Sequence, residues 1–69
     1  MWNNERFNKI IINVTKCDKG YSALLFGDGK VLFNFNIRNT SDKVINKALD
    51  YIYKKNMKYN RIDVVRNYI

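Results

Sequence analysis

The fold is decided by residues 18–38, which read DKGYSALLFGDGKVLFNFNIR. Asp28-Gly29 is typical of a two-residue β-hairpin loop, because both positions of that loop need a positive φ angle. Asp18-Lys19-Gly20 indicates a three-residue loop, with Gly20 in the left-handed conformation. The stretch therefore predicts two successive hairpins, with strands at about residues 7–17, 21–27 and 30–38.

The loop lengths also predict how the three strands pair. They place Val14 opposite Leu24, Leu24 opposite Phe33, and Phe26 opposite Val31. A shift of one residue in either hairpin would turn these apolar side chains to the opposite face of the sheet. The predicted inner face is apolar throughout and consists of Ile10, Ile12, Val14, Leu24, Phe26, Val31, Phe33, Phe35 and Ile37.

A helix at about residues 41–57 is expected to cover this inner face. Thr40 or Ser41 suits the helix cap, and Asp42 suits the positive end of the helix dipole. The segment carries an apolar stripe at helical spacing, formed by Val44, Ile45, Ala48, Leu49 and Ile52. Residues 60–69 fit either a short strand, which their β-branched residues favour, or a second helix capped by Asn60.

These elements predict one small α+β domain over residues 1–69: a three-stranded antiparallel meander with one amphipathic helix on one face, plus a C-terminal edge strand or short second helix. The element order resembles that of the ribonuclease H-like core if the C-terminal segment is a strand. That family binds metal through carboxylates on the first strand, the helix and the fourth strand. Of the carboxylates here only Asp63 lies in such a position, so the resemblance implies no catalytic site.

Composition excludes several further kinds of function. The 69 residues include 13 Lys or Arg, 6 Asp or Glu, one Cys and no His, which gives a net charge of +7. The lack of His excludes Ser-His and Cys-His catalysis and His-ligated metals. One Cys excludes an internal disulfide, and no stretch looks like a leader or a membrane span, which together predict a cytoplasmic protein. We therefore expect no enzyme activity, no cofactor, no metal and no membrane association.

The positive charge indicates nucleic acid, DNA or RNA, as the first candidate partner. Asn, Lys, Ile and Tyr, which AT-rich codons encode, make up 33 of the 69 residues. Part of the charge therefore reflects codon bias, and the composition is typical of AT-rich bacteria, their phages and mobile elements. The first hypothesis is a non-catalytic accessory protein that contacts backbone phosphates with little sequence preference. Its predicted contact residues are Lys43, Lys47, Lys54, Lys55, Lys58 and Arg38, with Tyr51, Tyr53 and Tyr59 available to stack on unpaired bases.

The alternative hypothesis is a small phage-type inhibitor or adaptor that binds a host defence enzyme or a nucleoprotein complex, in the style of anti-CRISPR or anti-restriction proteins. The predicted outer face of the sheet carries few charges, as partner interfaces often do. Its contact residues under this hypothesis are Tyr21, Leu25, Leu32, Asn34 and Asn36. The same face would also suit a homodimer, which would help to stabilise a domain of this size.

Overall fold

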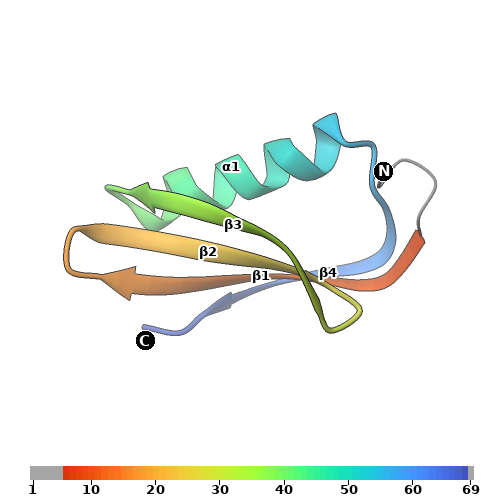
Figure 1. The fold of residues 1–69 in the computed structure, drawn as a ribbon, viewed down its shortest axis with the longest axis horizontal. Coiled ribbons are helices and arrows are strands. Elements are labelled where there is room, and N and C mark those ends of the chain that lie inside the picture. The colour runs from red at the N-terminus through yellow and green to blue at the C-terminus, as the bar shows by residue number, and fades with distance from the viewer. Residues whose placement is uncertain (1–5, 69) are drawn as a thin grey trace.

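A computed structural model describes residues 6–68 as a four-stranded sheet with one helix packed on one face (Figure 1). The elements are β1 (Arg6–Cys17), β2 (Gly20–Gly27), β3 (Lys30–Arg38), α1 (Ser41–Lys54) and β4 (Lys58–Arg66). The strand order is β3-β2-β1-β4. The predicted α+β class, the meander and the covering helix are confirmed, and the C-terminal segment is an edge strand rather than a second helix.

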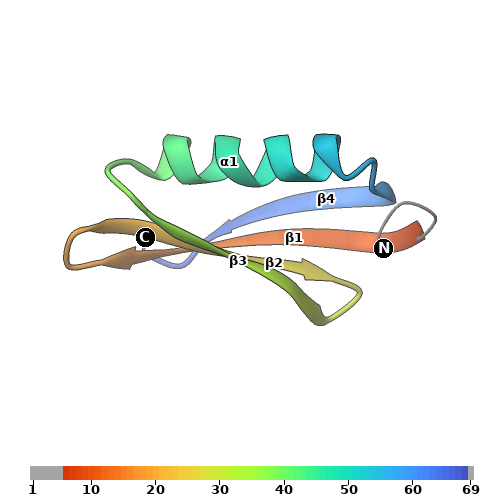
Figure 2. The ribbon, with the colours of Figure 1, turned by 45° about the horizontal axis from the view of Figure 1, so that its top comes forward.

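The last strand joins the sheet in a different direction from the meander. β4 pairs in parallel with β1, with Ile10 beside Ile62 and Ile12 beside Val64, whereas β1–β2 and β2–β3 are antiparallel. Parallel strands need a crossover of about a dozen residues or more, usually a helix. The 14 residues of α1 provide it, carrying the chain from the β3 edge across the sheet to the β4 edge (Figure 2).

Both ends of α1 are fixed by local hydrogen bonds. Thr40 is the N-cap, and its Oγ1 accepts a hydrogen bond of 3.2 Å from the Lys43 backbone N–H. The helix ends at Lys54 rather than at the predicted residue 57, because Asn56 adopts a positive φ of 53°. The backbone N–H of Met57 then donates to the Ile52 carbonyl oxygen, and both side chains are buried. This arrangement is a Schellman motif with its usual hydrophobic contact.

The pairing of β1 with β2 differs from the prediction by one residue. Cys17 pairs with Gly20, so the loop holds two residues, and Ile12 lies opposite Leu25 rather than Phe26. Leu25 is fully buried and Ala23 is 2% exposed, both beneath the helix, while Leu24 and Phe26 are half-buried on the other face. The predicted position of Leu25 on the outer face is therefore wrong, as is the predicted position of Leu24 and Phe26 on the inner face.

The physical reason lies in Gly20. The prediction used this glycine as the left-handed residue of a three-residue loop, but it begins β2 with a φ of 151°. A Cβ atom at this position would lie 2.1 Å from the carbonyl oxygen of Arg38. Gly20 is thus needed at the start of β2, both for its positive φ and for the close approach of the end of β3, rather than inside a three-residue loop.

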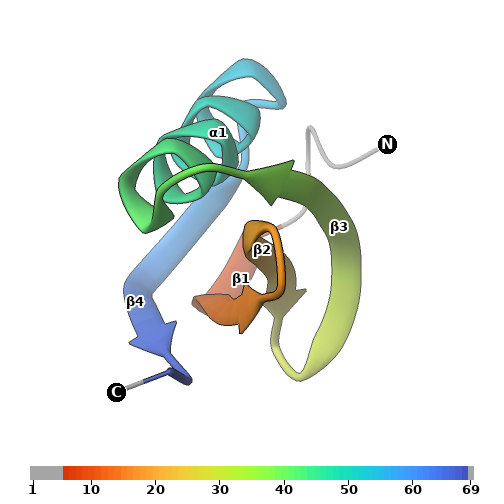
Figure 3. The ribbon, with the colours of Figure 1, turned by 90° about the vertical axis from the view of Figure 1, so that its left-hand side faces the viewer.

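β3 is irregular, and its irregularities curve it toward the helix. The pairing shifts between Leu25 and Phe26, and again between Tyr21 and Ala23. Phe26 pairs with Val31 as predicted, but the shift then pairs Phe33 with Leu25 instead of Leu24. Bulges of this kind bend a strand and increase its twist. Figure 3 shows β3 curving around the sheet until its end comes beside α1.

Asp28 fixes the other end of the sheet. It occupies the left-handed region with φ 51°, as the hairpin loop requires. Its Oδ1 also accepts hydrogen bonds of 3.0 Å from the backbone N–H groups of Asn8 and Lys9. Two successive N–H groups that reach one acceptor break the alternation of β1. Consequently Phe7 and Ile10, three positions apart, are both buried.

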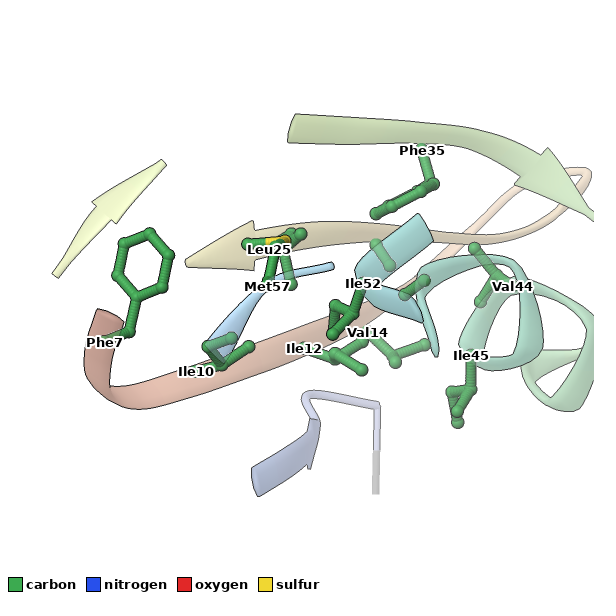
Figure 4. Close-up of a cluster of buried hydrophobic side chains, with 12 residues drawn as sticks. Phe7, Ile10, Ile12, Val14, Leu25, Phe35, Val44, Ile45, Ile52 and Met57 are labelled. Carbon is green, nitrogen blue, oxygen red and sulfur yellow. The ribbon is translucent and has the colours of Figure 1, made fainter. Parts of the chain in front are cut away.

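The core lies between the sheet and α1. Ile10, Ile12 and Val14 are fully buried in a row along β1, and Val44 and Ile52 of α1 face them (Figure 4). The remaining core residues come from every strand except β4 and from the helix with its C-terminal turn; they are Phe7, Ala23, Leu25, Phe35, Ile45, Ala48 and Met57. Of the predicted inner residues on β3 only Phe35 is buried, whereas Val31, Phe33 and Ile37 are exposed.

The corrected register predicts unequal effects for two neighbouring leucines. Leu25→Ala should lower the free energy of unfolding by about 2–5 kcal/mol, because it leaves a cavity in the core. Leu24→Ala removes the same atoms from a half-buried position and should cost less than half as much. Urea unfolding followed by circular dichroism measures both. A larger loss for Leu24→Ala would contradict the structure and favour the register predicted from the loops.

Candidate nucleic-acid interface

A hollow of about 500 Å³ lies between β3 and α1. Four of its side chains are cationic, and among the described residues that line it Asp50 is the carboxylate. The hollow, called the β3–α1 groove below, is lined by Phe33, Asn34, Phe35, Asn36, Arg38, Lys47, Asp50, Tyr51, Lys54 and Lys55. The groove therefore combines positive charge with aromatic rings.

The two elements place these side chains for different reasons. On α1, Lys43, Lys47 and Lys54 are separated by four and seven residues, a spacing that puts them on one side of a helix. On β3, the bulges turn the strand toward that side, and Arg38 at its end lines the groove. The positive surface is thus formed by two segments that are joined only through the Asn39-Thr40 connection.

Three aromatic rings form the floor of the groove. Phe33 stacks on Tyr51, with ring centroids 4.7 Å apart and an angle of 26° between the ring planes. Phe35 contacts both rings edge-on, at centroid distances of 4.8 Å and 5.5 Å. Phe35 is 8% exposed, but Phe33 is 43% exposed. The Phe33–Tyr51 stack is therefore anchored in the core through Phe35 and open to solvent at Phe33.

Cationic groups lie next to this aromatic floor. Lys55 Nζ is 5.7 Å from the centroid of the Tyr51 ring, within the range of a cation–π interaction. Lys54 Nζ is 3.1 Å from the Asp50 carboxylate, in an i,i+4 pair on the helix. Both partners of this pair are about half exposed or more, at 73% and 49% of their side-chain surface. The pair thus holds Lys54 at the groove without removing it from solvent.

The structure brings most of the predicted nucleic-acid contacts together. Arg38, Lys47, Lys54 and Lys55 line the groove, and Lys43 lines a smaller hollow of about 300 Å³ beside it together with Arg38, Lys47, Asp50 and Asn46. Lys58 lies apart, because the early end of the helix makes it the first residue of β4, and its Nζ donates to Asn56. Of the three predicted stacking tyrosines, only Tyr51 is in the groove; Tyr53 and Tyr59 line a separate hollow beyond the helix end.

Sequence reasoning missed Phe33 as a groove residue. The regular alternation of β3 predicts a buried Phe33, and the bulge that changes its position leaves no signal in the sequence. Asn34 and Asn36 were assigned to the outer face, and Asn34 does pair with Leu24 of the helix-free face, although both residues also border the groove at the edge of the sheet. The Phe-Asn alternation of residues 33–36 is typical of a strand with one apolar and one polar face. In the sheet this strand, β3, lies at an edge.

Three of the residues assigned to the predicted partner surface on the sheet pack in or against the core. Leu25 is in the core, Leu32 packs against the core, and Tyr21 packs against it with its ring 5.0 Å from that of Tyr68. The helix-free face carries other apolar residues: Ile11, Leu24 and Phe26 are half-buried there, Val31 pairs with Phe26, and Val65 pairs with Asn13. The correction therefore changes the composition of this face and leaves it partly apolar.

Asp63, the position that the ribonuclease H-like order singles out, is surrounded by cations. Its carboxylate lies 3.5 Å from Lys9 Nζ and 3.3 Å from Arg61 Nε, and its neighbour on β1 is Ile11. Within residues 6–68, no three His, Cys, Asp or Glu side chains gather into a group that could hold a metal ion. The described part of the chain also contains no helix long and apolar enough to cross a membrane.

Comparisons with protein-family models, curated proteins and solved structures found no match for this chain. The residues of the β3–α1 groove and the chemistry of their side chains therefore indicate the function.

The position of Asp50 predicts a salt-dependent effect on stability. Asp50→Asn removes the one anion among the described groove residues and should lower the free energy of unfolding by about 0.3–0.5 kcal/mol, the value of an exposed i,i+4 pair. The loss should be larger at low salt, because the neighbouring Lys and Arg side chains then repel one another more strongly. Urea unfolding at two salt concentrations measures it. A loss that grows with salt would contradict this electrostatic account.

Proposed function

We propose that this chain is a non-catalytic nucleic-acid-binding accessory protein of the cytoplasm, and its composition favours an origin in a phage or mobile element. The observation that supports the proposal is the convergence of Arg38, Lys47, Lys54 and Lys55 on one groove that contains a single described carboxylate. Such a group of cations attracts the backbone phosphates of a nucleic acid. Contacts of this kind position a backbone without reading its sequence.

The groove cations also set the expected salt dependence. Each phosphate neutralised lowers the logarithm of affinity by about 0.9 per tenfold rise in salt on duplex DNA, and by about 0.7 on single strands. Four phosphate contacts would therefore give a slope of about −3 to −4. Codon bias contributes to the net charge but does not explain why the cations gather at one groove. The slope of log affinity against log salt therefore tests phosphate contacts in the groove.

Charge reversal in and out of the groove tests the proposal. The triple variant Lys43→Glu, Lys47→Glu, Lys54→Glu should abolish binding, because it replaces attraction for phosphate with repulsion. The triple variant Lys16→Glu, Lys19→Glu, Lys30→Glu changes the net charge equally at positions outside the groove and should retain most of the affinity. Fluorescence anisotropy with labelled duplex DNA, single-stranded DNA and RNA at two salt concentrations gives both results.

Circular dichroism checks that each variant is folded, and Lys47→Gln with Lys54→Gln serves as a milder pair if charge reversal unfolds the helix. Equal affinity of the groove variant and the wild type would contradict the proposal. Equal losses in the two triple variants would show attraction by net charge alone. Absence of binding by the wild type near physiological salt would also reject nucleic acid as the partner.

A second candidate is supported by the helix-free face of the sheet. Val31 is 58% exposed and Val65 is 39% exposed on a face where no described element covers Ile11, Leu24 or Phe26. We propose as the alternative a small inhibitor or adaptor that binds a host protein or nucleoprotein complex there. A partner retained after nuclease treatment and at high salt, and lost on Val31→Asp but not on charge reversal in the groove, would support it.

A further inference from the structure

We infer that the β3–α1 groove takes single-stranded nucleic acid, with an unpaired base stacked on Phe33. This inference rests on the proposed nucleic-acid binding and adds to it the form of the ligand. Its central observation is that a 43% exposed phenyl ring lies on the floor of a groove lined by four cations. Cations alone suit duplex and single strands equally, so the aromatic floor has to distinguish them.

The exposed ring is held in place before any ligand arrives. Tyr51 supports Phe33 from the helix, and Phe35, itself buried, supports both rings from the core. A base placed on the exposed part of Phe33 would continue an existing stack of two rings. Because the rings are already ordered by packing, little side-chain entropy remains to be lost on binding.

Only an unpaired base can use this ring. In a duplex each base is stacked on both of its faces and presents only its edges to a protein, so an aromatic side chain on a groove floor gains no stacking contact. In a single strand the bases are accessible. Proteins that bind single strands without sequence preference combine a positively charged groove with aromatic side chains, because every base has a π-face.

The other lining groups suit a nucleotide. The volume of about 500 Å³ falls within the range of about 300–1,000 Å³ that is typical of small-molecule sites. Asn34 and Asn36 border the groove on the exposed edge strand β3. Arg38 lies at the end of β3, and Lys47 and Lys54 lie along α1. Phosphates on either side of a stacked base would therefore meet a cation.

The experiment compares three probes of the same length: an oligothymidylate, the corresponding abasic strand and a duplex. Wild-type protein should bind the oligothymidylate more tightly than the abasic strand, which has the same charge but no bases. Phe33→Leu keeps an apolar side chain and removes the π-face. It should weaken binding to the oligothymidylate by about 5-fold to 150-fold, the range measured for loss of one stacked base, and leave the abasic strand and the duplex unchanged.

Tyr53→Leu is the matched control, because it removes an aromatic ring of α1 that is 84% exposed but lies outside the groove. It should leave all three affinities unchanged. Equal binding of the three probes, with no effect of Phe33→Leu, would overturn the single-strand inference. Phosphate binding in the groove would then still stand if charge reversal abolished it. No binding to any probe would overturn both proposals.

Discussion

Burial of Ile10, Ile12 and Val14 beneath α1 is the interaction on which the rest of this domain depends. β1 carries these residues in a row and is hydrogen-bonded along both edges, to β2 in one direction and to β4 in the other. A chain of this length can form only one core. β2 and β4 are therefore placed by their pairing with β1, α1 by its packing on the inner face of β1, and β3 by its pairing with β2. An error of one residue in the β1–β2 pairing turns a whole strand over.

The same arrangement produces the candidate site. Because β4 occupies the free edge of β1, β3 remains an edge strand, and its bulges curve it toward the helix that crosses the sheet. Aromatic residues of β3 then meet a lysine-bearing side of α1. Phe35 completes the core, whereas Phe33 stays partly exposed on Tyr51. The groove thus forms where the curved strand β3 approaches α1, and both segments contribute cations to it.

The sequence was sufficient for those features that depend on local chemistry. The Asp28-Gly29 hairpin, the Thr40 cap and the Asp50–Lys54 pair each follow from a few adjacent residues, and the structure contains them. Four residues of the predicted apolar stripe of α1 are buried, whereas the fifth, Leu49, is 42% exposed. It was insufficient where distant segments decide. Residues 23–26 are apolar on both faces, so periodicity could not choose between Leu24 and Leu25, and Gly20 is explained by the distant Arg38 carbonyl. The four groove cations were among the predicted contact residues. The positions of Lys58 outside the groove and of Phe33 within it depend on distant segments and were not predicted.

Chemical-shift mapping by NMR tests most directly whether nucleic acid binds in the β3–α1 groove. Titration of ¹⁵N-labelled protein with a short single-stranded oligonucleotide should perturb the backbone amides of Phe33, Asn36, Arg38, Lys47 and Tyr51 most strongly. The amides of Leu24, Phe26 and Val65, on the helix-free face, should change little. Perturbations concentrated on that face, or none at saturating oligonucleotide, would contradict this account.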